Sequence, residues 1–350
     1  MENNEVLVER TGQLGHVLLN RPQAMNALNH GMIRAIAAAL DEWEHDASVA
    51  TVLISGAGER GLCAGGDVVS IYHDARRGGQ GSEQFWRDEY TLNARIHSYP
   101  KPMVAFMDGV VLGGGVGISA HARHRIVTER SRIGMPETGI GFVPDVGGSY
   151  LLARAPGETG THAALTGTMV SGADAIAMGL AGHYVHSSRL PTLVAELAHR
   201  SAAAVTARWG QQPSPSELEG SRAWIDQCYG ADDAGTILAR LARHSDPRAV
   251  AAGELIAAKS PTAVTVALAA LRRARGLGSL EEGLAQDLRV SLRAVQWPDF
   301  SEGIRAQLVD KDRNPQWLPA QLADVSAQLV ADAFAPLGAR ELKLPAAAAP

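Results

Sequence analysis

The pattern of hydrophobic and polar residues at the start of the chain predicts an α/β fold. Residues 5–9 and 16–20 read as two short strands around a turn at residues 11–13, which is a hairpin pattern. Residues 32–45 place apolar side chains at helical spacing, and residues 49–55 form a β-branched run typical of a buried strand. Strand, helix and strand in succession are typical of α/β proteins.

The middle of the chain continues this alternation. Residues 85–98 have a helical pattern, and an apolar strand-like run at residues 103–107 enters a turn at Asp108 and Gly109. Residues 110–112 lead from this turn into three consecutive glycines, after which residues 116–121 are expected to be helical. Further short helices are expected at residues 149–154, 160–165 and 172–178.

The composition of the sequence changes at about residue 190. From there it is rich in alanine and arginine, has a helical pattern and shows no clear strand. The stretch QQPSPS at residues 211–216 is the best linker candidate. The tail, residues 344–350, is rich in proline and alanine and is expected to be disordered. Between them, helices are expected at residues 221–227, 234–243, 247–257, 262–275 and 281–293.

Composition narrows the classes of function. The 350 residues are 46% hydrophobic and 20% charged, as in ordinary globular domains, and the net charge of −5 argues against nucleic acid as a partner. Two cysteines fit a reducing compartment. No apolar run reaches the roughly 18 residues of a membrane span, and the first residues are polar and acidic, unlike a secretory signal. We therefore expect a cytoplasmic protein without a membrane partner.

Two glycine-rich turns are candidates for a ligand site. Gly113, Gly114 and Gly115 lie between a strand-like run and an expected helix, and residues 61–67 form a second such turn before a helix beginning at Val68. Glycines at a strand-to-helix turn let backbone N–H groups approach a ligand closely. Two loops of this kind could supply two donors to one oxygen, which suits a phosphate, a carboxylate or a transient oxyanion.

Two isolated carboxylates follow these turns. Glu137 and Asp145 lie among apolar and turn-forming residues rather than in a solvated charge run. Each also has a structural interpretation, since Glu137 could begin a helix and Asp145 could cap the residues after it. Glu89, by itself, reads as a surface acid on a helix. Oxyanion donors followed by two sheltered acids suggest acyl chemistry.

Other chemistries are less well supported. The spacing Gly115-x-Gly117-x-x-Ala120 is a loose dinucleotide fingerprint, but a turn interrupts the approach to it. His121 and His124 lie on an expected helix without the acids that would complete a metal site. Cys63 fits a small buried residue better than a nucleophile. We therefore expect neither a metal nor a resident cofactor.

These residues together resemble the crotonase, or enoyl-CoA hydratase/isomerase, superfamily, over about residues 6–319. The general family pattern is carried by Asn20-Arg21-Pro22 with Asn26-Ala27-Leu28, by Cys63 to Asp67, and by Leu112 to Gly115. More narrowly, the chain is similar to the 3-hydroxyisobutyryl-CoA hydrolase branch. That likeness rests on the stretches at residues 89–93, 135–138, 142–150, 299–305 and 310–312.

The resemblance implies a role for each matched position. The N–H groups of Gly66 and Gly114 would form the oxyanion hole for a thioester. Glu137 would attack the thioester carbon or activate a water for that attack. Asp145 would contact the substrate hydroxyl or assist departure of the thiolate, and Glu89 would line the acyl pocket. The CoA adenine would lie along the backbone of Leu62 to Ala64, and Lys311 is a candidate for the CoA phosphates.

The resemblance also implies the fold and the reaction. We expect a crotonase (ClpP-like) spiral of β-β-α repeats over residues 1–200, with its acyl-CoA site, and a helical C-terminal region over residues 201–343. The expected activity is hydrolysis of 3-hydroxyisobutyryl-CoA in valine breakdown, with CoA entering as part of the substrate and a homo-oligomer allowed. The alternative is a hydratase or isomerase, which carries a second glutamate where this chain has Gly117.

Overall fold

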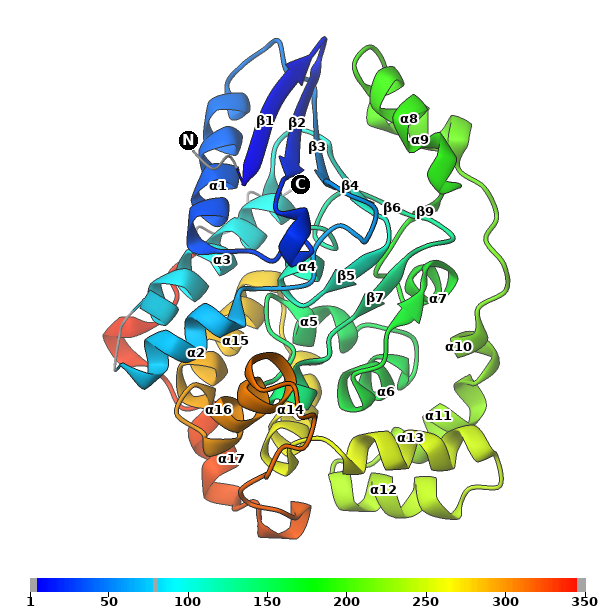
Figure 1. The fold of residues 1–350 in the computed structure, drawn as a ribbon. Helices are drawn as coiled ribbons and strands as arrows, with labels where there is room; N and C mark the ends of the chain where they lie inside the picture. Colours follow the sequence, from blue (N-terminus) through cyan, green and yellow to red (C-terminus); the bar gives the residue numbers. More distant parts are fainter. Residues whose placement is uncertain (1–4, 78–80, 345–350) are drawn as a thin grey trace.

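The computed structural model describes residues 5–77 and 81–344 and contains two sheets (Figure 1). In the larger sheet β1 and β2 form the expected hairpin, and all its other neighbouring strands are parallel. Its strands in spatial order are β1 (Val6–Thr11), β2 (Leu14–Leu19), β3 (Thr51–Gly56), β4 (Met103–Met107), β6 (His124–Val127) and β9 (His183–Tyr184). The smaller sheet contains β5 (Val110–Leu112), β7 (Arg132–Gly134) and β8 (Val170–Ser171).

The chain winds between the two sheets as a spiral. It places β4 in the large sheet and β5 in the small one, and then repeats the step with β6 and β7. The preceding turn follows the same path, because β3 leads to a segment in which Cys63 pairs in parallel with Val111 of β5. β5 and β7 of the small sheet therefore each follow a strand of the large one, which confirms the predicted crotonase spiral.

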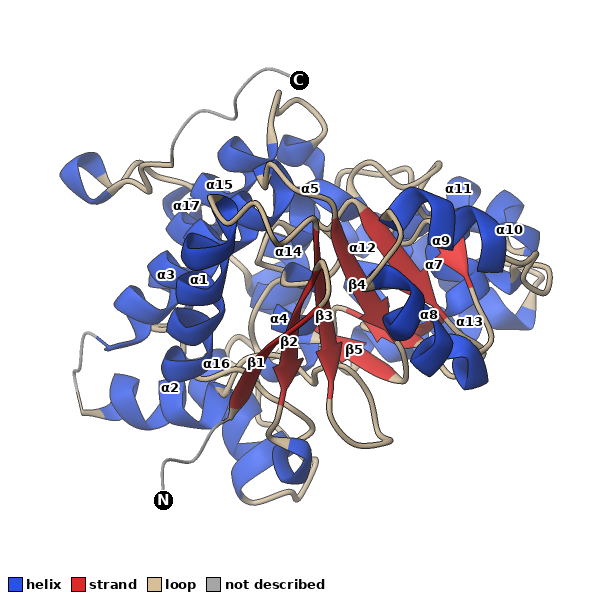
Figure 2. Cartoon of the chain, turned by 90° about the horizontal axis from the view of Figure 1, so that it is seen from above, coloured by secondary structure: helices blue, strands red, loops and turns tan. Residues whose placement is uncertain are grey.

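Alternation along the strands directs side chains into two layers. Val52 and Ile54 belong to the main buried cluster with α1 (His30–Glu44) and α3 (Gly81–Ser98). Leu53, between them, joins a second cluster with α8 (Leu190–Leu197) and α9 (Ala202–Trp209). Successive strand residues point to opposite faces, so the apolar run Val52–Ile54 is covered on both sides. Figure 2 shows the strands between these two groups of helices.

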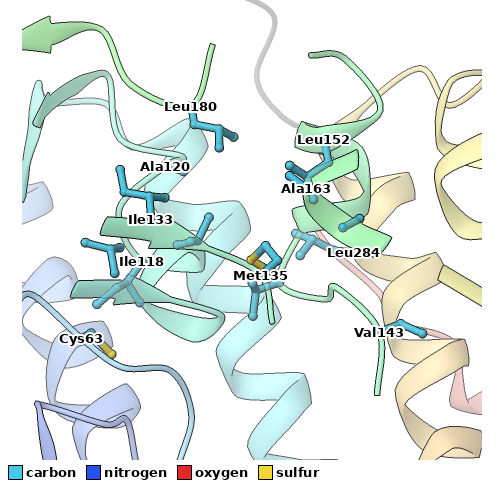
Figure 3. Packing of buried hydrophobic residues seen from close by; sticks show 14 of the residues in the cluster. Cys63, Ile118, Ala120, Ile133, Met135, Val143, Leu152, Ala163, Leu180 and Leu284 are labelled. Carbon is cyan, nitrogen blue, oxygen red and sulfur yellow. The ribbon is translucent and has the colours of Figure 1, made fainter. Parts of the chain in front are cut away.

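The C-terminal helices share the main core with the spiral. Side chains of α14 (Pro261–Ala274) and α15 (Leu280–Ala294) belong to the same buried cluster as the large sheet and α1. In Figure 3, Met135 lies between Ile133 and Leu284, a residue of α15. The remaining helices after residue 200 are α10 (Glu217–Gly220), α11 (Arg222–Tyr229), α12 (Ala234–Arg243), α13 (Pro247–Ala257), α16 (Pro298–Ile304) and α17 (Ala327–Ala333). The boundary expected at residue 200 therefore separates two parts of the chain that differ in composition, but both parts pack on the same core.

The shorter helices connect these parts. α2 (Val68–Arg76) precedes α3, and α4 (Gly114–Gly117) follows β5. The others in the first part of the chain are α5 (Gly148–Leu152), α6 (Thr159–Thr166) and α7 (Gly172–Ala177). Single turns occur at η1 (Pro22–Ala24), η2 (Glu137–Ile140), η3 (Ser187–Arg189), η5 (Leu322–Asp324) and η6 (Gly338–Arg340), and a π-helical turn at η4 (Arg305–Val309). Of the predicted tail, residues 345–350 lie outside the described residues.

The helix expected at residues 116–121 is wrong. α4 ends at Gly117, and the chain then turns until His124 begins β6, so His121 and His124 do not share a helix. Glycine has low helix propensity, and α4 contains three of its residues. The strands β6 to β9 were not predicted, because two to four residues are too few to show a period of two.

Among the described residues, no single helix is long and apolar enough to cross a membrane. Taken together, α13 and α14 reach that length and apolar character, but they are bent by 114° at their junction.

Candidate active site

Three loops at one end of the small sheet meet at a cavity of 510 Å³. The segment at residues 61–63, β5 and β7 are neighbours in this sheet, and the chain leaves each of them toward the cavity. The first loop carries Gly66, the second Gly114 and the third Glu137, and all three residues line the cavity. Carboxyl ends of parallel strands meet at one edge of a sheet, which is where such folds bind ligands. The volume is within the usual range for small-molecule sites.

The first loop is held by the residues of the family pattern. Asn26 accepts a hydrogen bond from the backbone N–H of Arg21 and donates to the carbonyls of Ala57 and Gly61. The Arg21 guanidinium donates to Asp67 at 3.0 Å, on the far side of Gly66. This polar network fixes the loop at both ends while leaving the Gly66 amide on the cavity side.

The second loop depends on glycine. Gly113 has φ +46°, a backbone conformation that other residues rarely adopt. A β-carbon at Gly113 would lie 2.6 Å from Glu137 Oε1, and one at Gly114 would lie 3.3 Å from the Gly66 nitrogen. Within the described part of the chain, neither the Gly66 nor the Gly114 amide donates to a protein acceptor. The structure thus brings together the two amides predicted for the oxyanion hole.

Glu137 begins η2, which follows β7 after Met135 and Pro136. Its side chain is buried, and Oε2 has no hydrogen-bond partner among the described residues. Burial raises the pKa of Glu137 well above its usual range, and the negative charges of Asp145 and Glu89 raise it further. The prediction that Glu137 begins a helical turn is therefore confirmed, and the structure places the same residue in the cavity.

Asp145 is held in place by α3 and α15. The Tyr90 hydroxyl donates to Asp145 Oδ2 at 2.7 Å and also bonds the Ser291 hydroxyl at 2.8 Å. Burial raises the pKa of Asp145 to about 7, although the Tyr90 hydrogen bond acts in the opposite direction. The alternative role as a helix cap is wrong, because Gly147 occupies the position before α5 and no side chain caps it.

Glu89 is not a surface acid. Its side chain is 2% exposed, it lines the cavity, and Oε1 has no partner among the described residues. Burial raises the pKa of Glu89 well above its usual range, and the Asp145 charge adds to the rise. A β-carbon at Gly114 would lie 2.6 Å from Glu89 Oε1. The carboxyl group therefore faces the loop of the expected oxyanion hole.

Gly117 has no room for the second glutamate of a hydratase. A β-carbon there would lie 2.7 Å from Val146 Cβ and 3.0 Å from Asn93 Nδ2. Val146 holds this place with φ +52°, an unusual conformation for a β-branched residue. A side chain at position 117 would require both neighbours to move.

The turn at Val146 is stabilised by residues that the sequence reasoning missed. Asp287 on α15 accepts hydrogen bonds from the Gly147 N–H at 2.8 Å and from the Ser149 hydroxyl at 2.6 Å. His121 bonds the carbonyl of Val146 at 2.8 Å. Backbone strain near a site persists only where the surroundings fix it. Asp287 lies 140 positions from Gly147, so no local signal in the sequence could have revealed the contact.

Of the residues expected to contact the CoA part of the substrate, only some line the cavity. Ala64 lines the cavity but Leu62 does not. The N–H groups of Leu62, Cys63 and Ala64 donate to the carbonyls of Asp108, Val110 and Met25, so an adenine there would have to use their carbonyl oxygens. Lys311 is exposed and is not among the lining residues, whereas Lys259, which was not predicted, is the one basic residue among the described ones that lines the cavity.

The remaining candidates have structural roles. Cys63 is fully buried, and burial raises the pKa of its thiol to about 12, so it is not poised as a nucleophile. His121 is buried against Val146 and His124 stacks on His183. Within residues 5–77 and 81–344, no group of three or more His, Cys, Asp or Glu side chains is placed to hold a metal ion.

Comparisons with known proteins identify the same family that the fold and the site indicate. The family model described as enoyl-CoA hydratase/isomerase matches residues 14–334. The spiral fold, the paired glycine amides and this match show that the chain belongs to the enoyl-CoA hydratase/isomerase family, the crotonases.

Relatives and solved structures of this family carry different names. The chain is 39% identical to the mitochondrial 3-hydroxyisobutyryl-CoA hydrolase of Rattus norvegicus, over 98% of this chain and 91% of that protein. It is 36% identical to the mitochondrial 3-hydroxyisobutyryl-CoA hydrolase of Homo sapiens, over 97% and 90%. A crystal structure described as a carnitinyl-CoA dehydratase from Mycobacterium thermoresistibile is 50% identical, with a TM-score of 0.95, over 98% of this chain and 100% of that one.

Proposed function

We propose that this protein hydrolyses the thioester of 3-hydroxyisobutyryl-CoA to 3-hydroxyisobutyrate and CoA, as a step of valine degradation. One observation carries the proposal: two open backbone amides share a cavity with Glu137 and Asp145, while Val146 and Asn93 close the second acid position at Gly117. The names of the rat and human relatives support the same substrate. A cavity lined mainly by apolar residues, with the four acids Asp67, Glu89, Glu137 and Asp145 among them, suits a 3-hydroxyacyl group.

In the proposed reaction the thioester oxygen lies between the amides of Gly66 and Gly114. These donors stabilise the negative charge that grows on this oxygen as the carbonyl carbon is attacked. Removal of one such donor costs roughly 2.7–4 kcal/mol of barrier in an enzyme of this kind. Because the amides belong to the main chain, they need no reorganisation when the charge develops.

Glu137 drives the attack by one of two routes that use the same atoms. In the first, its carboxylate bonds to the carbonyl carbon, the carbon–sulfur bond breaks, and water hydrolyses the resulting mixed anhydride. In the second, Glu137 takes a proton from the water that attacks. In both, the thiolate of CoA leaves and takes up a proton, and in this proposal Asp145 supplies that proton or binds the substrate hydroxyl. Trapping of a Glu137 hydroxamate with hydroxylamine would identify the first route.

A second candidate, hydration or dehydration of an acyl-CoA, is favoured by the 50% identity to the structure described as a dehydratase. Hydration of a double bond in this family uses two acids to place and polarise water. This chain offers Glu137 but holds Val146 and Asn93 at the other position. The geometry therefore favours hydrolysis.

The formation of free thiol distinguishes hydrolysis of the thioester from hydration or dehydration of the acyl group. The protein is expected to release CoA thiol from 3-hydroxyisobutyryl-CoA, followed with a thiol reagent, and to leave crotonyl-CoA and carnitinyl-CoA unchanged. Consumption of crotonyl-CoA or carnitinyl-CoA without thiol release from the hydroxy ester would contradict the proposed hydrolysis. Assays with and without a chelator test the accompanying proposal that no metal or further cofactor takes part.

A cytoplasmic location and a homo-oligomeric state are proposed separately. Both cysteines are free and buried, which fits a reducing compartment. The rat and human relatives are named as mitochondrial proteins. Cell fractionation and light scattering measure the two properties directly.

A further inference from the structure

The side chain of Glu89 lies near the two amides proposed for the oxyanion hole. The position that a β-carbon on Gly114 would take lies 2.6 Å from Glu89 Oε1 and 3.3 Å from the Gly66 nitrogen. That point is one bond from the backbone of Gly114 itself. Glu89 Oε1 therefore lies beside the backbone that carries both amides, on a side from which it can contact a ligand oxygen bound between them.

Oε1 of Glu89 is free for such a ligand. It is buried, and none of the described residues forms a hydrogen bond with it. Its surroundings toward the loop are apolar, because Leu28 Cδ1 lies 3.3 Å from the Gly114 β-carbon position and the Phe85 ring 3.6 Å from that of Gly66. A buried polar atom without a partner costs free energy, so its retention in a site calls for a partner that arrives with the ligand.

The charges around Glu89 favour its neutral form. The titratable groups that face it are Asp145, Glu137, Tyr90 and Cys63, and none of them is a cation. Burial and the Asp145 charge raise the pKa of Glu89 well above its usual range. An ionised Glu89 would repel the negative charge of the oxyanion, whereas the neutral acid has one O–H to donate.

We propose that Glu89, as a neutral carboxylic acid, is a third donor of the oxyanion hole and directs its O–H at the thioester oxygen beside the amides of Gly66 and Gly114. This inference rests on the proposed thioester hydrolysis. No bond of Glu89 is made or broken, since its proton stays on the carboxyl group while the hydrogen bond strengthens as charge grows on the oxygen. Neutral carboxylic acids can serve as oxyanion donors in apolar sites.

Two variants test whether Glu89 acts as a hydrogen-bond donor or as a negative charge. Glu89→Gln keeps an N–H donor of similar shape, and its kcat for 3-hydroxyisobutyryl-CoA is expected to stay within about tenfold of the wild type. Glu89→Leu has no donor, and its kcat is expected to fall about 10²–10³-fold, the usual effect of losing an oxyanion donor. Glu42→Gln, at an exposed position on α1, is the matched control for loss of an acid and is expected to leave kcat unchanged.

A substrate pair tests the competing interpretation that Glu89 binds the substrate hydroxyl. Isobutyryl-CoA lacks that hydroxyl but has the same thioester. An oxyanion donor predicts the same relative loss in Glu89→Leu for both esters. A loss confined to the hydroxylated ester would overturn the proposal, and so would a Glu89→Gln variant as impaired as Glu89→Leu.

An infrared measurement does not depend on turnover. Isobutyryl-CoA labelled with ¹³C at the carbonyl is bound to the Glu137→Gln protein, and its carbonyl stretch is compared with and without Glu89→Leu or Glu89→Gln. The stretch is expected at lower frequency with Glu89 or Gln than with Leu, because one more donor polarises the carbonyl. Equal frequencies in all three would overturn the proposal. Absence of thiol release by the wild type would instead refute the proposed function, and the infrared comparison would still decide the role of Glu89.

Discussion

Glu137 and Asp145 are buried acids of one cavity with opposite surroundings. Asp145 accepts a hydrogen bond from Tyr90, which is itself bonded to Ser291, whereas Oε2 of Glu137 has no partner among the described residues. Both side chains are less than a tenth exposed. Burial raises the pKa of both. The Tyr90 hydrogen bond lowers that of Asp145 again, to about 7, whereas the negative charge of Asp145 raises that of Glu137 further. Equal burial thus leaves Asp145 held by a hydrogen-bond donor and Glu137 Oε2 without a partner among the described residues.

The largest effect is expected at the acid without a partner. Glu137→Gln keeps the shape of the side chain but removes the carboxylate, so kcat is expected to fall at least about a hundredfold, the lower end of general-base contributions. Steady-state thiol release measures it, and circular dichroism checks the fold. Unchanged turnover would remove Glu137 from the mechanism and with it the distinction between the two acids.

The pH dependence of the wild-type rate is a second test of the role of Glu137. Glu137 must be ionised to act as nucleophile or base, and its pKa is raised, so the rate is expected to rise with pH beyond the usual range for a glutamate. A flat profile from about pH 5 to pH 8 would contradict the assignment. The profile of kcat/KM reports the free enzyme.

A smaller change is expected where the partnered acid loses its donor. Tyr90→Phe removes the hydrogen bond that favours the charged form of Asp145, so the pKa of Asp145 should rise above about 7. Hydrogen bonds to charged groups contribute about 1.5–3 kcal/mol, which corresponds to a rise of roughly one to two pH units. Infrared titration of the protonated carboxyl band, with Asp145→Asn to assign it, measures the shift. No shift would show that Tyr90 does not stabilise the carboxylate.

Lys259 adds the opposite charge to this cavity and is expected to have a modest effect. It is partly buried, lines the cavity, and has a lowered pKa because of its burial. If it contacts the CoA phosphates, Lys259→Gln should raise KM about fivefold with little change in kcat, since partly exposed charge contacts contribute up to about 1 kcal/mol. The exposed Lys343→Gln serves as control. An equal KM for both variants would leave the phosphates to other residues.

The smallest effect on activity is expected at Asp287, which supports the Asp145 turn. Asn at this position can still accept from Gly147 and donate to Ser149, so kcat/KM should change less than about threefold. Stability should respond to pH instead. Burial raises the pKa of Asp287 to about 8 from an ordinary 3.8, so between these values the unfolded chain releases a proton that the folded chain keeps.

The free energy of unfolding therefore falls as pH rises through that window, by at most about 1.4 kcal/mol per pH unit for one group. Asp287→Asn removes this contribution, so its denaturation midpoint should depend less on pH than that of the wild type. Urea titrations at pH 5 and pH 8 measure both proteins. If the denaturation midpoints of both proteins depended equally on pH, the proton taken up on folding would not be bound by Asp287.

Much of this protein could be predicted from its sequence. The hairpin, β3, β4, α1, α3 and most of the C-terminal helices follow from periodic apolar positions in long enough segments. The glycine turns at Gly66 and Gly114 and the sheltered acids Glu137 and Asp145 were visible because local chemistry marks them. The short strands β6 to β9 and the truncated α4 were not, since tertiary pairing outweighs local preference over a few residues.

Tertiary structure alone decided what these groups can do. Glu89 reads as a surface acid on its helix, and only the packing of α3 against the Gly114 loop buries it beside the two amides. Asp287 bonds the Gly147 N–H from 140 positions along the chain, and Ser291 bonds the Tyr90 hydroxyl from 201 positions away. Burial and the distances between charges determine a pKa, and both are properties of the folded chain that no run of neighbouring residues encodes.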